Sequence, residues 1–241
     1  MRQNHDKEKL KAEALCDIDA YITELHNSSD EKQRKKAALV SYWLKDYIRL
    51  LKKEETFLPQ KQLSYNRGSI IKVHLGFRIG SEEGGLHYAV VLDRKPKKSS
   101  PVLTIVPLSS KKGNRIIRDN EVDIGNEVFR KIISKYDTLK ADTVKRINKL
   151  EAGLENEKEY VPEIHTEVRR MNGQIKKLGN LIDEIVRMKQ GSIALAGQIT
   201  TVSKIRIYDP THSGQLLDGI SLEPATLDKI DAKIKELYVK T

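Results

Sequence analysis

A glycine-rich acidic loop, Gly80 to Gly85, is followed after one residue by His87 and then by the apolar run Tyr88 to Leu92. An imidazole can donate or accept a proton near neutral pH, so His87 at the mouth of a buried strand could act as a general acid or base. The glycines would let the loop pass close to a bound molecule. A single histidine at the start of a strand is more often structural than catalytic. The surrounding elements must therefore decide between the two interpretations.

The composition favours a folded protein with polyanionic partners. Of the 241 residues, 38% are hydrophobic and 32% are charged, which is enough for one compact core and a second, more solvated part. Aromatic residues make up only 5%, so a second large core is not expected. The excess of 44 lysines and arginines over 34 acidic residues gives a net charge of +10, which favours nucleic acid by counterion release.

Cysteine and histidine usage predicts neither a disulfide nor a metal site. Cys16 is the single cysteine, and His74, His165 and His212 lack ligand spacing with cysteine, aspartate or glutamate. The charged N-terminus is not followed by the apolar core of a signal peptide, and no run reaches the roughly 18 apolar residues of a membrane span. We expect a soluble, cytoplasmic protein that needs no cofactor and does not bind a membrane.

The first 53 residues show helical spacing of apolar side chains. The segment Asn27 to Glu31 interrupts this pattern, and Ser28 with Glu31 three residues later forms a possible capping box. We therefore predict two N-terminal helices.

From Arg67 onward the period falls to two, or to short apolar runs between turn residues. Short strands with little helix between them predict a small barrel. The expected strands are Ser69 to Leu75, His87 to Asp93, Val102 to Leu108, Glu121 to Ile124, Ser192 to Thr200 and Lys204 to Tyr208.

A long helical block separates the early strands from the late ones. Apolar stripes run from Phe129 to Leu154 and from Val161 to Ile185, and the chain has to go out and return for both sets of strands to share one barrel. We therefore predict an antiparallel helical hairpin. Its stripes are interpreted as packing between the two helices, and replacing Asn126 to Arg187 by a short linker is expected to leave a soluble barrel. A last helix, Pro224 to Tyr238, should dock on the barrel.

Four segments, in order, carry a resemblance to a known family. They are RGSIIKVHLGFRIG, SEEGGLHYAVVLDR, SPVLTIVPLSSK and GSIALAGQITTVSKIRI. With the residues between and around them, the match extends over about half of the chain. They resemble the basic-Gly start of the first strand, the G-S-E-x-G-G loop, the third strand ending in a hydroxyl residue and the Q-I-R-T-like segment of the MazF/PemK family of toxin endoribonucleases. A lone glycine-rich loop would be weak evidence, but four ordered segments are fairly specific.

The resemblance implies an α+β fold with a small SH3-like (MazF/PemK-like) β-barrel. Around it we expect an N-terminal helical segment at 1–58, the barrel at 66–125 and 190–241, and the inserted hairpin at 126–189. The implied activity is metal-independent cleavage of single-stranded RNA, in which the 2′-hydroxyl attacks the adjacent phosphorus to give a cyclic phosphate and a 5′-hydroxyl. The implied partners are a neutralising protein antitoxin and a second copy of the chain in a homodimer.

The resemblance also implies which residues form the site. His87 stands where the family has its catalytic arginine, and as an acid–base group it could replace that residue. Ser109 stands where the family has a catalytic threonine, and Glu82 would brace or border the active-site loop. The implied RNA contacts are Arg67, Arg78, Ser81, Lys111, Lys112, Gln198 and Thr200.

Two other functions remain open from the sequence. The exchange at His87 could mark a non-catalytic barrel that binds nucleic acid or a protein partner, since fold does not fix function. Alternatively, the helical parts could carry the function, as an oligomerisation module or an antitoxin-like neutralising module.

Overall fold

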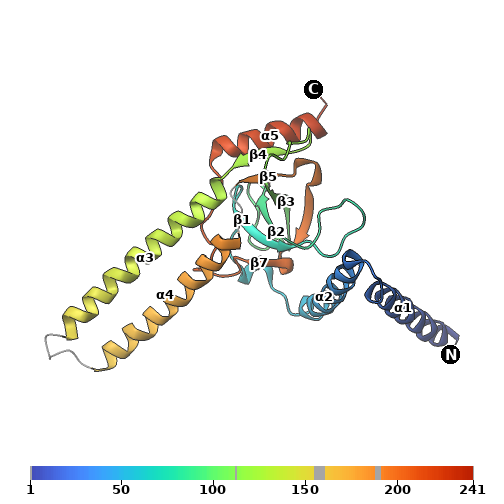
Figure 1. Ribbon diagram of the computed structural model, residues 1–241, viewed down its shortest axis with the longest axis horizontal. Coiled ribbons are helices and arrows are strands. Elements are labelled where there is room, and N and C mark those ends of the chain that lie inside the picture. Colours follow the sequence, from blue (N-terminus) through green and yellow to red (C-terminus); the bar gives the residue numbers. More distant parts are fainter. Residues whose placement is uncertain (1, 112, 155–160, 188–190, 241) are drawn as a thin grey trace. The chain divides into compact units, whose positions relative to one another are not determined.

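The computed structural model describes residues 2–111, 113–154, 161–187 and 191–240. The chain divides into two compact units, one formed by Met1–Phe57 with Gly76–Gly85 and the other by Leu58–Leu75 with Leu86–Thr241 (Figure 1). The hairpin and the sheet thus fall within one unit. The boundaries of these two units differ from the predicted ones. The division into N-terminal helices, barrel and inserted hairpin therefore stays a prediction.

The first unit contains the two predicted N-terminal helices, α1 (Arg2–His26) and α2 (Glu31–Glu54). The predicted capping box is wrong. The side chain of Asp30 caps α2 by accepting a hydrogen bond from the backbone N–H of Lys32 at 2.9 Å, whereas Ser28 Oγ accepts one from the N–H of Asp30. Because the helix begins at Glu31, an aspartate directly before it satisfies a terminal N–H that Ser28 is too far away to reach.

Helices α1 and α2 pack against each other near the turn that joins them. Leu25 and Ala37 are buried there, and Lys36 Nζ donates to the hydroxyl of Tyr21 at 2.6 Å. Farther along α1, Leu10 is 66% exposed and Leu15 is also exposed. The packing of this helix pair is therefore strongest at its turn.

The second unit is built on one antiparallel sheet, and the α+β class is confirmed. Its path is β4-β5-β3-β2-β1-β7, with β6 paired to β3 outside this path. The described strands are β1 (Ile70–His74), β2 (Leu86–Val91), β3 (Val102–Ser110), β4 (Val122–Gly125), β5 (Ser192–Ala194), β6 (Thr200–Ser203) and β7 (Ile207–Asp209).

The sheet is not closed into a barrel by hydrogen bonds among the strands that the structure describes, so the predicted barrel is not confirmed. The predicted strand Ser192–Thr200 is not continuous. A 3-10 turn, η2 (Ala196–Gln198), divides it, because β5 pairs with the end of β3 and β6 with its beginning. Similarly, the predicted strand Lys204–Tyr208 begins as a 3-10 turn, η3 (Lys204–Arg206), before β7.

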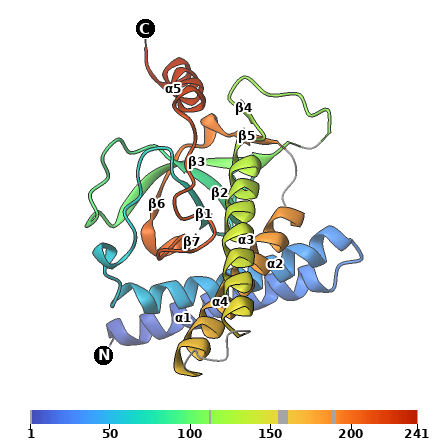
Figure 2. The ribbon, with the colours of Figure 1, turned by 90° about the vertical axis from the view of Figure 1, so that its left-hand side faces the viewer.

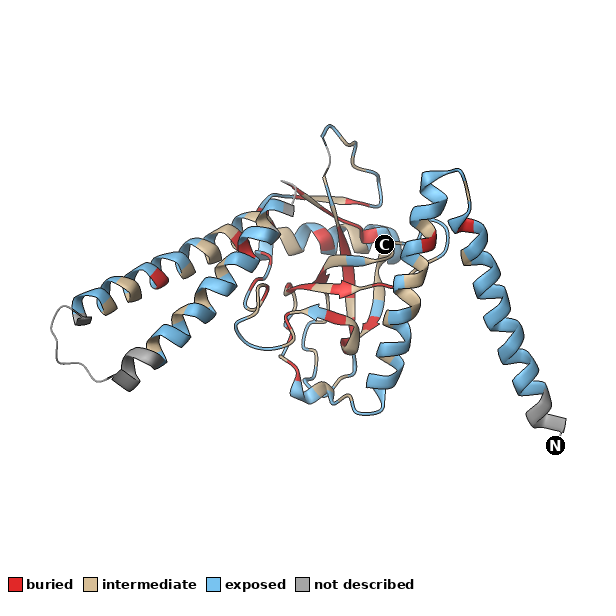
Figure 3. Ribbon diagram, turned by 60° about the horizontal axis from the view of Figure 1, so that its bottom comes forward, coloured by how far each residue is buried: buried red, intermediate tan, exposed pale blue. Residues whose placement is uncertain are grey.

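Side chains alternate between the two faces of the sheet along each strand. Both faces are buried, and each contributes to its own core (Figure 3). Ile71, Val73, Ala89 and Val91 point into a strand-side core with residues of β3, β6 and β7. The alternate residues, such as Val90, join a helix-side core that α3, α4 and α5 complete. We use these two names for the two faces below.

The predicted antiparallel hairpin is present as α3 (Glu127–Leu154) and α4 (Val161–Arg187), which lie side by side (Figure 1). Arg146 pairs with Glu167 at 3.0 Å, and Gln174 donates to Asp142 at 3.0 Å, which fixes the antiparallel register.

Contrary to expectation, side chains of the hairpin form part of the core of the sheet. Val128 and Ile132 of α3 and Leu181 of α4 belong to the helix-side core. Replacing the whole hairpin by a linker would leave the apolar side chains under it exposed to water, so the expected soluble barrel is not supported.

The last helix, α5 (Pro224–Tyr238), docks on the sheet as predicted, beside β4 and η2 (Figure 2). Ile230 is fully buried in the helix-side core. The carboxylate of Glu127, at the start of α3, accepts hydrogen bonds from the N–H of Glu223 and the hydroxyl of Thr226, both at 2.6 Å. This contact joins the beginnings of α3 and α5.

Candidate active site

His87 and Ser109 lie at the same end of two paired strands. In the register of β2 and β3, Tyr88 stands opposite Leu108, and His87 and Ser109 are the next residues outward. Because Tyr88 and Leu108 face the helix-side core, alternation turns His87 and Ser109 to the other face. The structure therefore brings together two of the three predicted catalytic residues.

A backbone contact orients the His87 ring. Its Nδ1 lies 3.2 Å from the carbonyl oxygen of Leu108, on the neighbouring strand. Since a carbonyl oxygen only accepts hydrogen bonds, Nδ1 carries the proton of this contact. In the neutral ring, Nε2 is then the nitrogen with the lone pair, as a general base requires.

An arginine that the sequence did not reveal contacts Ser109. Arg115 donates from Nη1 to Ser109 Oγ at 3.3 Å, and its Nη2 pairs with the carboxylate of Glu121. The side chain of Glu121 is only 4% exposed and also accepts the N–H of Arg118 at 3.1 Å. We call Ser109, Arg115 and Glu121 the Arg115 cluster. It holds a guanidinium beside the hydroxyl, with its other end fixed by a buried carboxylate.

The turn composition around Lys111 to Asn114 gave no reason to single out Arg115. The available signal was Glu121, an acidic residue at the start of an apolar strand, six residues after Arg115. A buried carboxylate requires a cation or several donors, and Arg115 and Arg118 are the nearest arginines in sequence.

Lys111 follows the end of β3 and is engaged in an ion pair. Its Nζ lies 2.5 Å from Oδ2 of Asp123 on β4. This hydrogen bond, together with the N–H of Gly125, holds the pKa of Asp123 below its usual value. The predicted RNA contact at Lys111 is thus near Ser109 in sequence and space, but its charge is compensated. Lys112 lies outside the described residues.

Two other predicted RNA contacts, Arg67 and Thr200, are not brought to this end of the sheet. Arg67 donates to the carbonyl of Leu92 and pairs with Asp231 of α5, at the far end of β2. At roughly 3.3 Å per residue, that end is about 16 Å from His87. Thr200 stands opposite Ile105, about 13 Å along β3 from Ser109 on the same basis, and Gln198 ends the turn η2.

The remaining predicted site residues lie in the loop Gly76–Gly85, which belongs to the first unit. Arg78 pairs with Glu82 at 3.7 Å, and the N–H of Gly85 donates to the carbonyl of Gly76 at 2.7 Å, which closes the loop on itself. Gly85 has a φ of +85°, which favours glycine. Ser81 is exposed in this loop. The roles of Glu82, Arg78 and Ser81 stay predictions.

Within the described ranges, no group of three histidine, cysteine or carboxylate side chains is arranged to hold a metal ion. In the same residues, no helix combines the length and apolar character needed to cross a bilayer.

Comparison with known proteins agrees with the resemblance seen in the sequence. The model of the PemK-like, MazF-like toxins of type II toxin–antitoxin systems matches residues 66–172. This region contains β1 to β4, the loop Gly76–Gly85, the Arg115 cluster and the beginning of the hairpin. A search of curated proteins finds no match. Over residues 66–172, the chain is thus similar to the PemK-like, MazF-like toxins of type II toxin–antitoxin systems.

Proposed function

We propose that the protein is a toxin endoribonuclease that cleaves single-stranded RNA, mRNA included, without a metal ion. The observation that supports this most is the Arg115 cluster, with His87 beside it at the end of β2. Three features fit the same reaction. They are the similarity to a family of toxins, the positive net charge of the chain, and the hydroxyl, guanidinium and imidazole groups on one face of the sheet.

In the proposed reaction the 2′-hydroxyl of the substrate attacks the adjacent phosphorus, and the bond from phosphorus to the 5′-oxygen breaks. A general base takes the proton of the 2′-hydroxyl, and a general acid protonates the leaving 5′-oxygen. The products are a 2′,3′-cyclic phosphate and a 5′-hydroxyl. His87 is the proposed acid–base group, with Nε2 as the reacting nitrogen.

Negative charge develops on the phosphoryl oxygens during this step, and donors placed there in advance stabilise it. We assign this role to Arg115 and to the hydroxyl of Ser109. Arginine matches phosphate geometry with two parallel N–H groups. In this proposal His87 carries out proton transfer and Arg115 stabilises charge. Glu121 is a positioning residue, because it holds Arg115 and has no proposed contact with RNA.

The finer features that the family suggests belong to the same proposal. These are an SH3-like closure of the sheet, a homodimer, neutralisation by a protein antitoxin, growth arrest on expression, a coiled-coil hairpin and action in the cytoplasm. Glu82, Arg67, Arg78, Ser81, Lys111, Lys112, Gln198 and Thr200 remain proposed contributors to RNA contact.

The test is incubation of the purified protein with a labelled, unstructured RNA in excess EDTA, followed by analysis of the fragment ends. We expect cyclic-phosphate and 5′-hydroxyl termini. Cleavage that requires added Mg²⁺ would contradict the metal-free reaction. RNA that binds but is never cut would favour the alternative, a non-catalytic member of the family that binds nucleic acid.

A further inference from the structure

The positive charges that were expected to meet RNA are largely paired with carboxylates. Arg67 pairs with Asp231, Arg78 with Glu82 and Lys111 with Asp123. A paired cation attracts a phosphate less strongly, because its partner cancels most of its charge at a distance. Much of the net charge of +10 must therefore be located elsewhere.

A cavity of about 490 Å³ on the helix-side face of the sheet is lined by more cations than carboxylates. It lies between β1, α3, α4 and the connection from β7 to α5. Four lysines and one aspartate line it, a formal excess of three positive charges: Lys72, Lys135, Lys176, Lys177 and Asp209. We call this cavity the lysine cavity.

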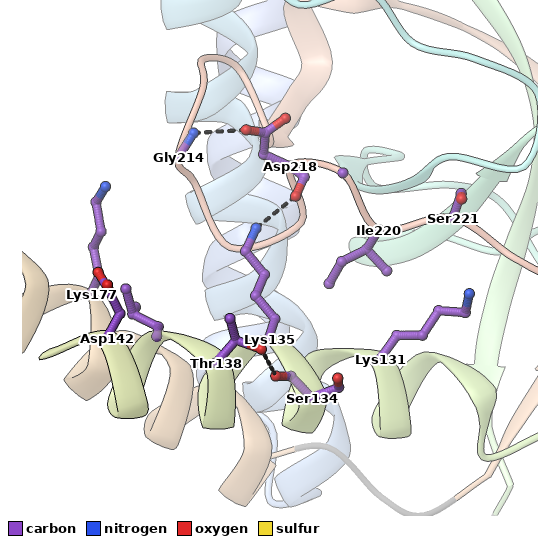
Figure 4. Close-up of a pocket in the computed structure, with 12 residues that line it drawn as sticks. Lys131, Ser134, Lys135, Thr138, Asp142, Lys177, Gly214, Asp218, Ile220 and Ser221 are labelled. Atoms are coloured by element: carbon purple, nitrogen blue, oxygen red, sulfur yellow. Dashed lines mark hydrogen bonds between the residues drawn. The ribbon is translucent and has the colours of Figure 1, made fainter. Parts of the chain in front are cut away.

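Backbone groups hold Lys135, which lines the lysine cavity. Its Nζ donates to the carbonyl of Gln215 at 2.9 Å. It also donates to the carbonyl of Asp218 at 2.6 Å (Figure 4). An ammonium group has three N–H donors, so these two bonds leave one donor for a ligand. Burial lowers the pKa of Lys135, and the carboxylates of Asp218 and Asp209 act in the opposite direction.

Lys177 reaches from α4 to the same place. Its Nζ lies 2.9 Å from the position that a Cβ at Gly214 would take, so the ammonium group approaches the loop closely. Lys176 and Lys177 are exposed, and neither has an ion-pair partner in the part of the chain that the structure describes. Their charges are available to an anion.

The cavity also offers an aromatic surface. Tyr208 of β7 lines it and is 63% exposed, and His212 lies in the same wall. Aromatic side chains of this kind stack with nucleobases, at a gain that is insensitive to base identity. The lysines could contact a phosphate and the tyrosine could stack on a base, so the cavity suits one nucleotide. Its volume lies in the range of sites that bind small ligands.

The adjoining cavity, of about 660 Å³, does not have this excess of charge. It shares Lys135 and Lys177 but adds the carboxylates of Asp142 and Asp218 (Figure 4). Its additional lysine, Lys131, pairs with Glu223. We therefore place the ligand in the lysine cavity.

We propose that the lysine cavity binds a nucleotide unit, with its phosphate at Lys135, Lys176 and Lys177 and its base against Tyr208. The nucleotide is either part of a substrate RNA or a free nucleoside phosphate, and both present the same chemistry. The RNA source rests on the proposed function. Because Lys72 and Tyr88 lie on the helix-side face, this site is separate from His87 and Ser109 on the other face.

The test measures binding of a fluorescent 5′-nucleoside monophosphate and of a fluorescent RNA hexanucleotide to the full-length protein. Lys176→Ser/Lys177→Ser is expected to weaken the binding of both probes about tenfold or more. It should also lower the slope of log affinity against log salt for RNA by up to about 1.4, which corresponds to two phosphate contacts. The matched control is Lys145→Ser/Lys149→Ser, which removes two exposed lysines of the same hairpin outside the cavity. It should change affinity less than twofold.

Two further variants make the test specific. Asp209→Asn removes the cavity's carboxylate and should strengthen binding severalfold. Tyr208→Ser should lower the affinity for the nucleotide, but inorganic phosphate should compete for the site as well as it does in the wild type. Tighter binding of the hexanucleotide than of the monophosphate identifies RNA as the source, and equal affinities identify a free nucleotide.

Equal weakening by both double-lysine variants, or no binding of either probe to the wild type, would overturn the site. These outcomes are independent of cleavage. If the protein binds nucleotide here but never cuts RNA, the proposed function fails and the nucleotide site stands. If it cuts, Lys176→Ser/Lys177→Ser should raise KM for long RNA and leave kcat unchanged.

Discussion

The Arg115 cluster and the lysine cavity lie on opposite faces of one sheet and treat charge in opposite ways. Arg115 is neutralised by the buried Glu121 and fixed between it and Ser109. Lys176 and Lys177 have no such partner within the described residues. A paired cation has a fixed position but little long-range attraction, whereas unpaired cations attract an anion without orienting it. The first arrangement suits chemistry at a phosphoryl group, and the second suits binding.

The largest expected effect concerns the hairpin, on which the lysine cavity depends. Replacing residues 127–187 by a Gly-Ser linker should abolish cooperative unfolding, because Val128, Ile132 and Leu181 leave the helix-side core. Replacing only residues 147–168 should leave the far-UV spectrum of the sheet and the nucleotide affinity intact. Thermal melts of both proteins check this. A stable, soluble product of the complete deletion would show that the core does not need the hairpin.

The next largest effect is a difference in stability between variants of the Arg115 cluster and variants of the lysine cavity. Arg115→Met should cost about 3–5 kcal/mol, because the buried Glu121 loses its partner. Lys176→Ser/Lys177→Ser should change stability by less than about 0.5 kcal/mol per site, since both side chains are exposed. Urea denaturation measures both.

A second substitution separates folding from function at Arg115. Arg115→Met/Glu121→Gln should recover most of the lost stability, because no buried charge remains, but RNA cleavage should stay at least about 100-fold below wild type. Full recovery of cleavage in this double variant would assign Arg115 to structure alone.

The smallest expected effect is a pH dependence within the lysine cavity. Burial raises the pKa of Asp209, although its carboxylate accepts the N–H of Leu217 at 2.8 Å. A carboxylate with a raised folded pKa contributes stability at low pH that is lost as pH rises through that pKa. The free energy of unfolding of the wild type should therefore fall, relative to Asp209→Asn, as pH increases from about 4. A difference independent of pH would contradict this.

The sequence predicted most elements because their periodicities are local. The last helix and the first four strands follow from apolar spacing, and the hairpin follows from that spacing together with the need for the chain to return to the sheet. Four ordered segments carried the resemblance to the family. The division of the strand after Ser192 was not predictable, because η2 depends on β5 and β6 pairing with different halves of β3.

The Arg115 cluster was missed for a related reason. Its contact with Ser109 depends on how the turn after β3 folds back, and in the sequence Arg115 is one basic residue among several. The lysine cavity draws on residues from 72 to 216, which only the tertiary structure brings together. Conversely, the predicted contact at Arg67 followed the family motif, while the structure uses its side chain to tie β2 to α5.

The most direct test of the account is the single-turnover rate of RNA cleavage in EDTA for His87→Ala, beside His26→Ala as a matched control on the exposed end of α1. Loss of the acid–base group should lower the rate by about 100- to 10,000-fold, while the His26 variant should cleave at the wild-type rate. Both variants should show the wild-type circular dichroism spectrum. Cleavage by folded His87→Ala at the wild-type rate would contradict the proposed active site.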